Sequence, residues 1–263
     1  MIPLRDSVTL ARRPLVTAAL VAGSVIAYLL SIRAAGSILD GPPHQTIVAY
    51  GATPYELTHL GSHCALAAAG FSQTVLCSGQ RGVVGSTPSQ PATWETIFSS
   101  LFVHANLLHL VLDGCFLAVF GATLEDALGR PRFLAFWLLG GLAAVALTTA
   151  VHPDSTTATI GASGAIAAVG AAHVVLHPGA RVQTLVVLPF HIGAPRLPAW
   201  ALLAVWLALE VVLGAVHAIT APGGGAGTVV VALLGGLAFG VLAAQLFARG
   251  RLAPPAAAAA GGA

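Results

Sequence analysis

Long uncharged apolar segments constrain this chain more than any other feature of its sequence. Of its 263 residues, 57% are hydrophobic and only 8% are charged, whereas soluble domains carry about 25% charged residues. A helix needs about 20 apolar residues to cross a bilayer. Six segments approach or reach that length: 14–32, 97–124, 133–151, 160–176, 198–219 and 228–247. The sequence therefore predicts an all-α integral membrane protein with six transmembrane helices.

The distribution of arginine predicts how these helices are oriented. Lysine is absent, so arginine supplies all 11 basic side chains. With the N-terminus in the cytoplasm, every arginine except Arg33 and Arg81 lies on the inner side, as the positive-inside rule requires. Residues 1–13 and 249–263 are then cytoplasmic, and the second of these is an Ala-, Gly- and Pro-rich tail that we expect to be disordered. We expect one multi-pass domain over residues 14–248 in a bacterial inner membrane, with both termini inside.

A long outer loop, residues 33–96, joins the first two predicted helices. It contains Cys64 and Cys77, while Cys115 lies inside the second segment. On the oxidising side of a bacterial membrane the two loop cysteines can form a disulfide, although two unpaired thiols fit the sequence equally well. The net charge of +2 and the lack of a basic tract argue against a nucleic-acid partner.

Ionisable side chains inside apolar segments are costly and are functional candidates by default. The second segment holds His104, His109 and Asp113, and the i,i+4 spacing of the last two places them on one helix face. The fourth segment opens with Ser163 between two glycines. Because both helices enter from the outer side, all four side chains share one leaflet. The sequence therefore predicts a site that opens to the extracytoplasmic side.

Several of these residues also have a purely structural interpretation. Gly161 and Gly164, like Gly236 and Gly240, fit close packing between helices, and a serine between glycines more often packs than reacts. Glu210, in the middle of the fifth segment, has no partner that the sequence identifies. Zinc motifs such as HExxH and paired CxxC are absent. We therefore expect no metal and no cofactor.

Four motifs together resemble the rhomboid family of intramembrane serine proteases. They are HANLLHLVLD in the second segment, LEDALGRPRF after it, GASG opening the fourth and LLGGLAFG in the sixth. The resemblance runs over nearly the whole chain and implies a six-helix bundle in which the GxSG serine attacks a transmembrane substrate. It implies Ser163 as the nucleophile, His109 in the oxyanion hole and His104 as the earlier histidine of the motif. The glycines it marks as supporting are Gly161, Gly164, Gly235, Gly236 and Gly240.

Two positions depart from the family pattern. Leu233 stands where the family has the histidine that takes the serine's proton, and Asp113 stands where it has the oxyanion-hole asparagine. A serine needs an adjacent base to become nucleophilic, and losing one oxyanion donor costs about 10²–10³ in rate. With these two departures, the resemblance implies a rhomboid-type protein that binds transmembrane segments of client proteins, with hydrolysis lost or weak.

A second interpretation keeps the protease active with a non-standard base. His109, oriented by Asp113, or His217 at the outer end of the fifth segment would take the proton of Ser163, and a protonated Asp113 would donate to the oxyanion. A third interpretation is a transporter or channel with Asp113 and Glu210 on a proton path, but no inverted repeat or pair of broken helices supports it. The expected partners are transmembrane proteins and membrane lipid; the sequence leaves the clients and the oligomeric state open.

Overall fold

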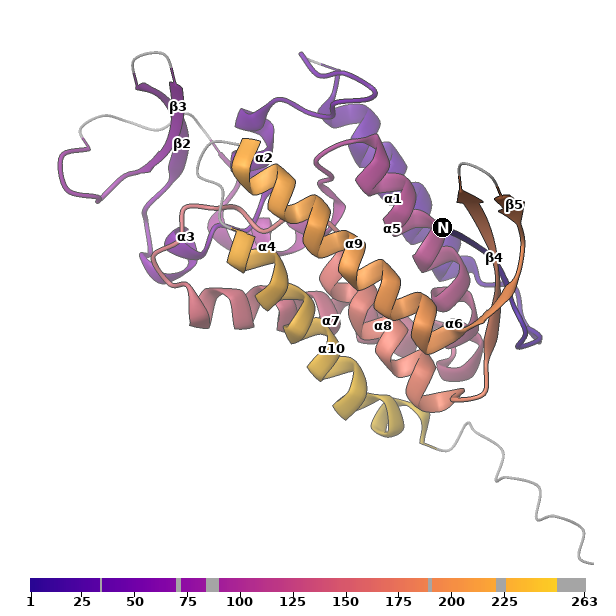
Figure 1. Ribbon diagram of the computed structural model, residues 1–263. Helices are drawn as coiled ribbons and strands as arrows, with labels where there is room; N and C mark the ends of the chain where they lie inside the picture. The colour runs from indigo at the N-terminus through magenta and orange to yellow at the C-terminus, as the bar shows by residue number, and fades with distance from the viewer. Residues whose placement is uncertain (34, 70–71, 84–89, 189–190, 221–225, 250–263) are drawn as a thin grey trace, which may run out of the picture.

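The computed structural model describes the whole chain except residues 34, 70–71, 84–89, 189–190, 221–225 and 250–263. It is mostly helical, as the sequence predicts (Figure 1). The helices are α1 Leu15–Ser31, α2 His44–Tyr50, α3 Pro54–Thr58, α4 Thr93–Ser99, the 3-10 turn η1 Ser100–Phe102, α5 Leu107–Phe116, the π-helical turn η2 Leu117–Gly121, α6 Ala122–Leu128, α7 Arg130–Val151, α8 Ser163–Leu176, α9 Ala199–Thr220 and α10 Ala226–Ala248. Apart from Arg249, the tail predicted to be disordered lies outside the described residues.

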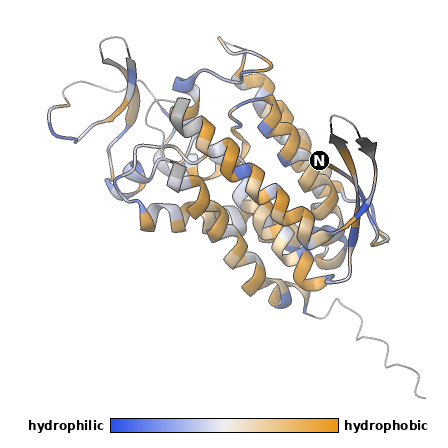
Figure 2. Ribbon diagram, viewed as in Figure 1, coloured by the Kyte–Doolittle hydropathy of each residue, from blue (hydrophilic) through white to orange (hydrophobic). Residues whose placement is uncertain are grey.

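Four helices in the described part of the chain are long and apolar enough to cross a membrane: Leu107–Leu128, Arg130–Val151, Ala199–Val216 and Gly227–Ala248. The first of them joins α5, η2 and α6 into one continuous helix. Two shorter apolar helices, α1 and α8, fall in the first and fourth predicted segments. Each predicted segment therefore contains an apolar helix, and Figure 2 shows hydrophobic residues along most of their length.

The second apolar helix begins later than the sequence predicts. Residues 97–102 belong to α4 and η1, and α5 starts only at Leu107. The cause is a local cap, because the side-chain oxygen of Asn106 accepts a hydrogen bond from the N–H of His109 at 2.9 Å. His104 therefore lies in a connection ahead of the helix and not on it.

Helix α8 forms the centre of the bundle, with α7, α9 and α10 packed around it. All its residues from Ser163 to His173 are buried. Small residues allow this close packing, since a Cβ atom on Gly236 of α10 would overlap the carbonyl oxygen of Gly164. Many of the largest fully buried side chains belong to the helices around it, among them Phe116, Phe120, Phe133, Phe136, Trp137 and Trp206.

Two small antiparallel sheets accompany the helices, which the prediction of an all-α protein did not include. Strands β2 (Cys64–Ala69) and β3 (Ser72–Cys77) form a hairpin in the outer loop. The second sheet lies at the opposite end of the molecule (Figure 1) and contains β1 Ile2–Asp6, β4 Arg181–Leu188, β5 His191–Gly193 and β6 Arg196–Pro198. Strands this short depend on their tertiary partners more than on intrinsic preference, so a search for long apolar segments misses them.

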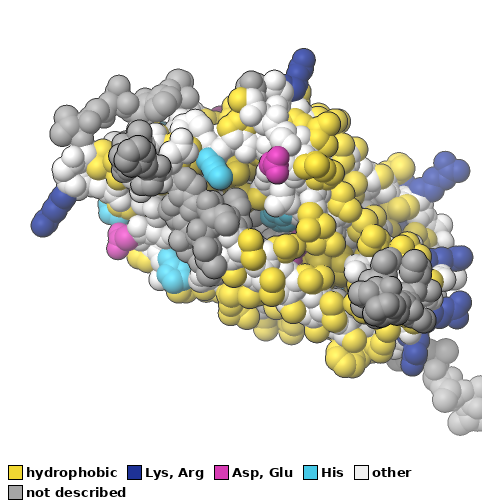
Figure 3. Space-filling view, turned by 45° about the horizontal axis from the view of Figure 1, so that its top comes forward, with side chains coloured by type: hydrophobic (Ala, Val, Ile, Leu, Met, Phe, Trp, Pro, Cys, Tyr) yellow, Lys and Arg dark blue, Asp and Glu magenta, His cyan; other side chains and the backbone are white. Residues whose placement is uncertain are grey.

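Exposed arginines gather at the end of the molecule that carries this second sheet (Figure 3, dark blue). Arg5, Arg181 and Arg196 come from the sheet itself, and all three are exposed. Hydrophobic side chains cover the adjoining flank (Figure 3, yellow). This charge asymmetry is the pattern on which the predicted orientation depends.

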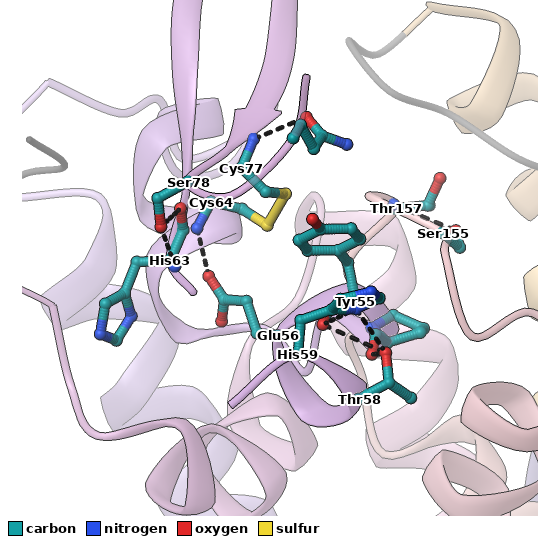
Figure 4. Close-up of a disulfide and its surroundings, with 12 residues drawn as sticks. Tyr55, Glu56, Thr58, His59, His63, Cys64, Cys77, Ser78, Ser155 and Thr157 are labelled. Atoms are coloured by element: carbon teal, nitrogen blue, oxygen red, sulfur yellow. Dashed lines mark hydrogen bonds between the residues drawn. A yellow bond between two sulfur atoms is a disulfide. The ribbon is translucent and has the colours of Figure 1, made fainter. Parts of the chain in front are cut away.

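The outer loop is folded and not extended. Its hairpin is closed by a disulfide between Cys64 and Cys77, which lie opposite each other in the strand register (Figure 4). Glu56 of α3 accepts a hydrogen bond from the backbone N–H of Cys64. A bridge between Ala52 and Thr159 ties the loop to the connection between α7 and α8. The loop is thereby fixed above the start of α8.

Candidate active site

A cavity of about 110 Å³ lies where α5, α8, α9 and α10 meet the outer loop. Apolar side chains of the loop, including Val48 of α2 and Leu66 and Val75 of the hairpin, form part of its wall. Its polar lining within the bundle comprises Asn106, His109, Ser163, Glu210 and Thr228. Polar side chains that are far apart in the sequence therefore converge on one space.

Ser163 is the first residue of α8 and is 8% exposed. The chain turns just before it at Gly161, whose φ of 90° favours glycine and whose N–H donates to the carbonyl of Ser100 at 2.9 Å. Because Ser163 opens the helix, the backbone N–H groups of the first turn have no partner within it. These groups can stabilise an anion that forms beside the hydroxyl.

His109 reaches the same cavity from α5. A Cβ atom added to Gly161 would lie 2.7 Å from both Cε1 and Nε2 of His109, so the imidazole packs against the backbone two residues before Ser163. The His109 side chain is 17% exposed. The ring is thus held beside the loop that carries the serine and still reaches the cavity.

Asp113 lies one turn further along α5 and contacts both histidines. Its Oδ2 atom is 3.6 Å from Nε2 of His109 and 3.4 Å from Nε2 of His104. The first contact follows from the i,i+4 spacing seen in the sequence. The second arises because the connection before α5 folds back, where Nδ1 of His104 donates to the carbonyl of Phe102 at 3.0 Å. Asp113 is only 2% exposed.

Glu210 joins this group from α9 and is 4% exposed. Its Oε2 atom lies 3.8 Å from Nε2 of His109. This partner of Glu210 was not predictable from the sequence, because the contact joins residues on two helices that are far apart in the chain. The one available signal was its position, since a carboxylate in the middle of an apolar helix must face the protein interior.

Within the bundle, two further polar residues of the cavity lining were not singled out from the sequence. Asn106 caps α5 and lines the cavity beside His109. Thr228 lines it from the first turns of α10 and is 7% exposed. Asn106 was detectable, because an asparagine directly before an apolar periodic run is a helix-start signal.

Leu233 lies in the hydrophobic core and is 3% exposed. It precedes Gly236 by three residues and so shares its helix face, and Gly236 abuts the carbonyl of Gly164. Leu233 therefore lies on the side of α10 that packs against α8, and its side chain offers no atom that accepts a proton. The side chain of His217, the other candidate base, lies outside the described part of the structure.

The protein has helices that are long and apolar enough to span a bilayer, and a polar cavity lies among their ends. These two features define an integral membrane protein with an internal polar site. The Rhomboid domain family matches residues 91–250, more than half of the chain, and this stretch contains α4 to α10 and every polar side chain named above for the cavity's lining. The protein belongs to the rhomboid family. Comparisons with curated proteins and with solved structures gave no match.

Proposed function

We propose that this rhomboid protein binds transmembrane segments of client proteins at the cavity beside Ser163, and that its hydrolysis of those segments is lost or weak. The proposal places it in a bacterial inner membrane with six spans and both termini in the cytoplasm. One observation supports it: Leu233, which has no atom that accepts a proton, is buried on the side of α10 that packs against α8, while a cavity remains beside Ser163.

The chemistry explains why this leucine matters. A positioned general base contributes about 10²–10⁴ to the rate, and a serine hydroxyl is a weak nucleophile without one. Enzymes that lose one member of a serine triad retain only about 10³–10⁴ over the reaction in water. The second departure acts in the same direction, because an ionised Asp113 would repel an oxyanion that an asparagine would stabilise.

The depth of the cavity favours binding of a transmembrane segment. Helix α8 has 14 residues, so it rises about 21 Å, less than the roughly 30 Å of a bilayer core. With its far end at the cytoplasmic interface, its first residue, Ser163, lies below the outer surface. A locally unwound client helix at that depth needs partners for its backbone groups, which the polar lining of the cavity supplies.

One observation favours a second function, that of an active intramembrane serine endopeptidase. His109 shares the cavity with Ser163, and its Nε2 atom lies within 4.0 Å of the carboxylates of Asp113 and Glu210, which would stabilise its protonated form. In this reaction His109 takes the proton of Ser163 as the hydroxyl attacks the scissile carbonyl. It then returns the proton to the leaving amine.

Photo-crosslinking tests client binding. A photoreactive residue at Leu213, which lines the cavity, is illuminated in the full-length protein in liposomes that contain a single-span model peptide. The matched control carries the same residue at Leu242, which is 81% exposed. We expect crosslinks at 213 to exceed those at 242 severalfold and to decline when unlabelled peptide is added. Equal, non-competable crosslinking at both positions would contradict client binding at the cavity.

A further inference from the structure

Three side chains from two helices converge beside the cavity: His109, Asp113 and Glu210. One ligand atom from each lies within 4.8 Å of the other two. We propose that these residues bind one divalent transition-metal ion of the Zn²⁺ class. The site is additional to the serine chemistry and does not depend on the proposed function.

The spacing of the ligand atoms suits such an ion. Zn²⁺ binds nitrogen and oxygen ligands at about 2.0–2.2 Å in tetrahedral geometry, which separates the ligands by about 3.3–3.6 Å. Nε2 of His109 is 3.6 Å from Oδ2 of Asp113 and 3.8 Å from Oε2 of Glu210. Small side-chain rotations therefore close the set around one ion.

The two buried carboxylates in this region also favour binding of a cation. Both carboxylate oxygens of Asp113 and Oε1 of Glu210 are buried and accept no hydrogen bond from the described residues. Within the same part of the chain, the ion pairs of these two acids are with histidines alone. Two ionised carboxylates in a buried site are strongly unfavourable without compensation, and one divalent cation neutralises both.

His104 supports the site from the side away from the cavity. Its Nδ1 carries a hydrogen, because the carbonyl oxygen of Phe102 can only accept. Its other ring nitrogen, Nε2, lies 3.4 Å from Oδ2 of Asp113. His104 is 1% exposed, so the arrangement is fixed by packing. It provides a second nitrogen next to the proposed ligands.

An ion can reach this point through the cavity. His109 and Glu210 both line it, and a volume of about 110 Å³ exceeds the roughly 10–15 Å³ that one water requires. Catalytic zinc sites typically have three protein ligands and a fourth position that is open to water. One imidazole with two carboxylates also suits Mn²⁺, Fe²⁺ and Co²⁺.

This inference departs from the expectation of no metal, which was based on motifs within single helices. The ligand set draws on α5 and α9, so no local spacing reveals it. It also has a chemical consequence for the neighbouring serine. An ion on Nε2 of His109 uses the lone pair that would accept the proton of Ser163, so bound metal and His109 acting as a base exclude each other.

The test uses the full-length protein in lipid nanodiscs, stripped of metal with EDTA and titrated with Co²⁺ while visible absorption is recorded. We expect one Co²⁺ per chain, with the absorption bands of a four- or five-coordinate site, and displacement by Zn²⁺. Glu210→Gln and Asp113→Asn each remove one anionic ligand and keep the side-chain shape. Each should weaken binding by more than the roughly 10–100-fold that a change beyond the ligands produces.

Two matched controls separate this site from others. Glu125→Gln changes another buried membrane-domain glutamate, 3% exposed, and His59→Asn changes a half-exposed histidine near Asp154 on the surface. Both should keep the wild-type affinity. The proposal is overturned if no stoichiometric binding occurs, if His59→Asn abolishes it, or if every folded ligand variant binds like the wild type. Protons shared among the side chains would then neutralise the cluster. Two independent ligand variants keep the test decisive should one fail to fold.

Discussion

The backbone of Gly161 lies directly against the imidazole ring of His109. A Cβ atom at position 161 would lie 2.7 Å from two ring atoms, and the residue has a φ of 90°. Gly161 therefore has two roles. It turns the chain into α8, and its lack of a side chain leaves room for the His109 ring beside the cavity that Ser163 lines. This contact determines how α5 and α8 share the cavity.

Gly161→Ala should accordingly displace His109 and destabilise the protein. Left-handed backbone costs a non-glycine residue about 1–2 kcal/mol, and overpacking adds about 1–3 kcal/mol. The matched control is Gly61→Ala, where φ is 85° but no atom lies within 4 Å of the added Cβ. Thermal unfolding in nanodiscs should show a clearly larger loss for position 161. Equal losses would mean that the ring contact contributes nothing.

Gly236→Ala should weaken the packing of α10 on α8 by about 1–3 kcal/mol, since the added methyl meets a backbone carbonyl that cannot rotate away. Gly114→Ala is the comparison, because its Cβ would meet only Val21, at 3.9 Å. There the better helix propensity of alanine should leave stability unchanged or raise it by up to about 1 kcal/mol. Unfolding measured on both variants checks the contrast, and a neutral Gly236→Ala would refute close α8–α10 contact.

The disulfide of the hairpin predicts a defined thiol pattern. Without reductant, alkylation of the unfolded chain should label Cys115 alone; after reduction it should label all 3 cysteines. Replacing Cys64 and Cys77 by serine should lower the stability of the outer loop by about 2–4 kcal/mol, visible as faster amide exchange in β2 and β3. Cys115→Ser should leave that exchange unchanged. Labelling of all cysteines before reduction would rule out the bond.

Glu56 predicts a pH dependence of the same loop. Burial raises the pKa of Glu56 above its ordinary value of 4.5, while the N–H of Cys64 and the nearby His63 oppose the rise. The folded loop therefore favours the protonated acid, and this contribution to stability is full below about pH 4.5 and is lost as the pH rises through the higher folded pKa.

The opening free energy of the hairpin, from amide exchange corrected for intrinsic rates, should accordingly fall as the pH rises from about 4.5. Glu56→Gln keeps an oxygen acceptor for Cys64 and should remove most of this dependence. Glu95→Gln, at an exposed position, should not. An unchanged pH profile in Glu56→Gln would assign the effect to another group.

The sequence was sufficient for those features that depend on local periodicity. Apolar segments located the helices, the i,i+4 spacing placed His109 and Asp113 on one face, and GASG placed Ser163 at a helix start. The contact between His109 and Glu210 was not predictable, because it depends on how α5 and α9 are rotated against α8. That rotation results from packing of the whole bundle and leaves no signal in either segment alone.

Two other features could not be predicted from the sequence, for different physical reasons. His104 lies outside α5 because the N-cap at Asn106 interrupts an otherwise continuous apolar stretch. The capping hydrogen bond, and not the length of the apolar stretch, determines where this helix begins. Strand β4 pairs with β1 near the N-terminus, and such long-range pairing depends on the tertiary environment more than on the strand's composition.

Cleavage of a single-span model substrate in proteoliposomes tests the central claim most directly. Wild type, Ser163→Ala and Leu233→His are compared in the same lipid. We expect the first two to be equally inactive and Leu233→His to gain serine-dependent cleavage, with a rate increase of about 10²–10⁴ from a positioned base. The double variant Ser163→Ala, Leu233→His should be inactive again. Wild-type cleavage that Ser163→Ala abolishes would contradict the account and make His109 the first candidate for the base.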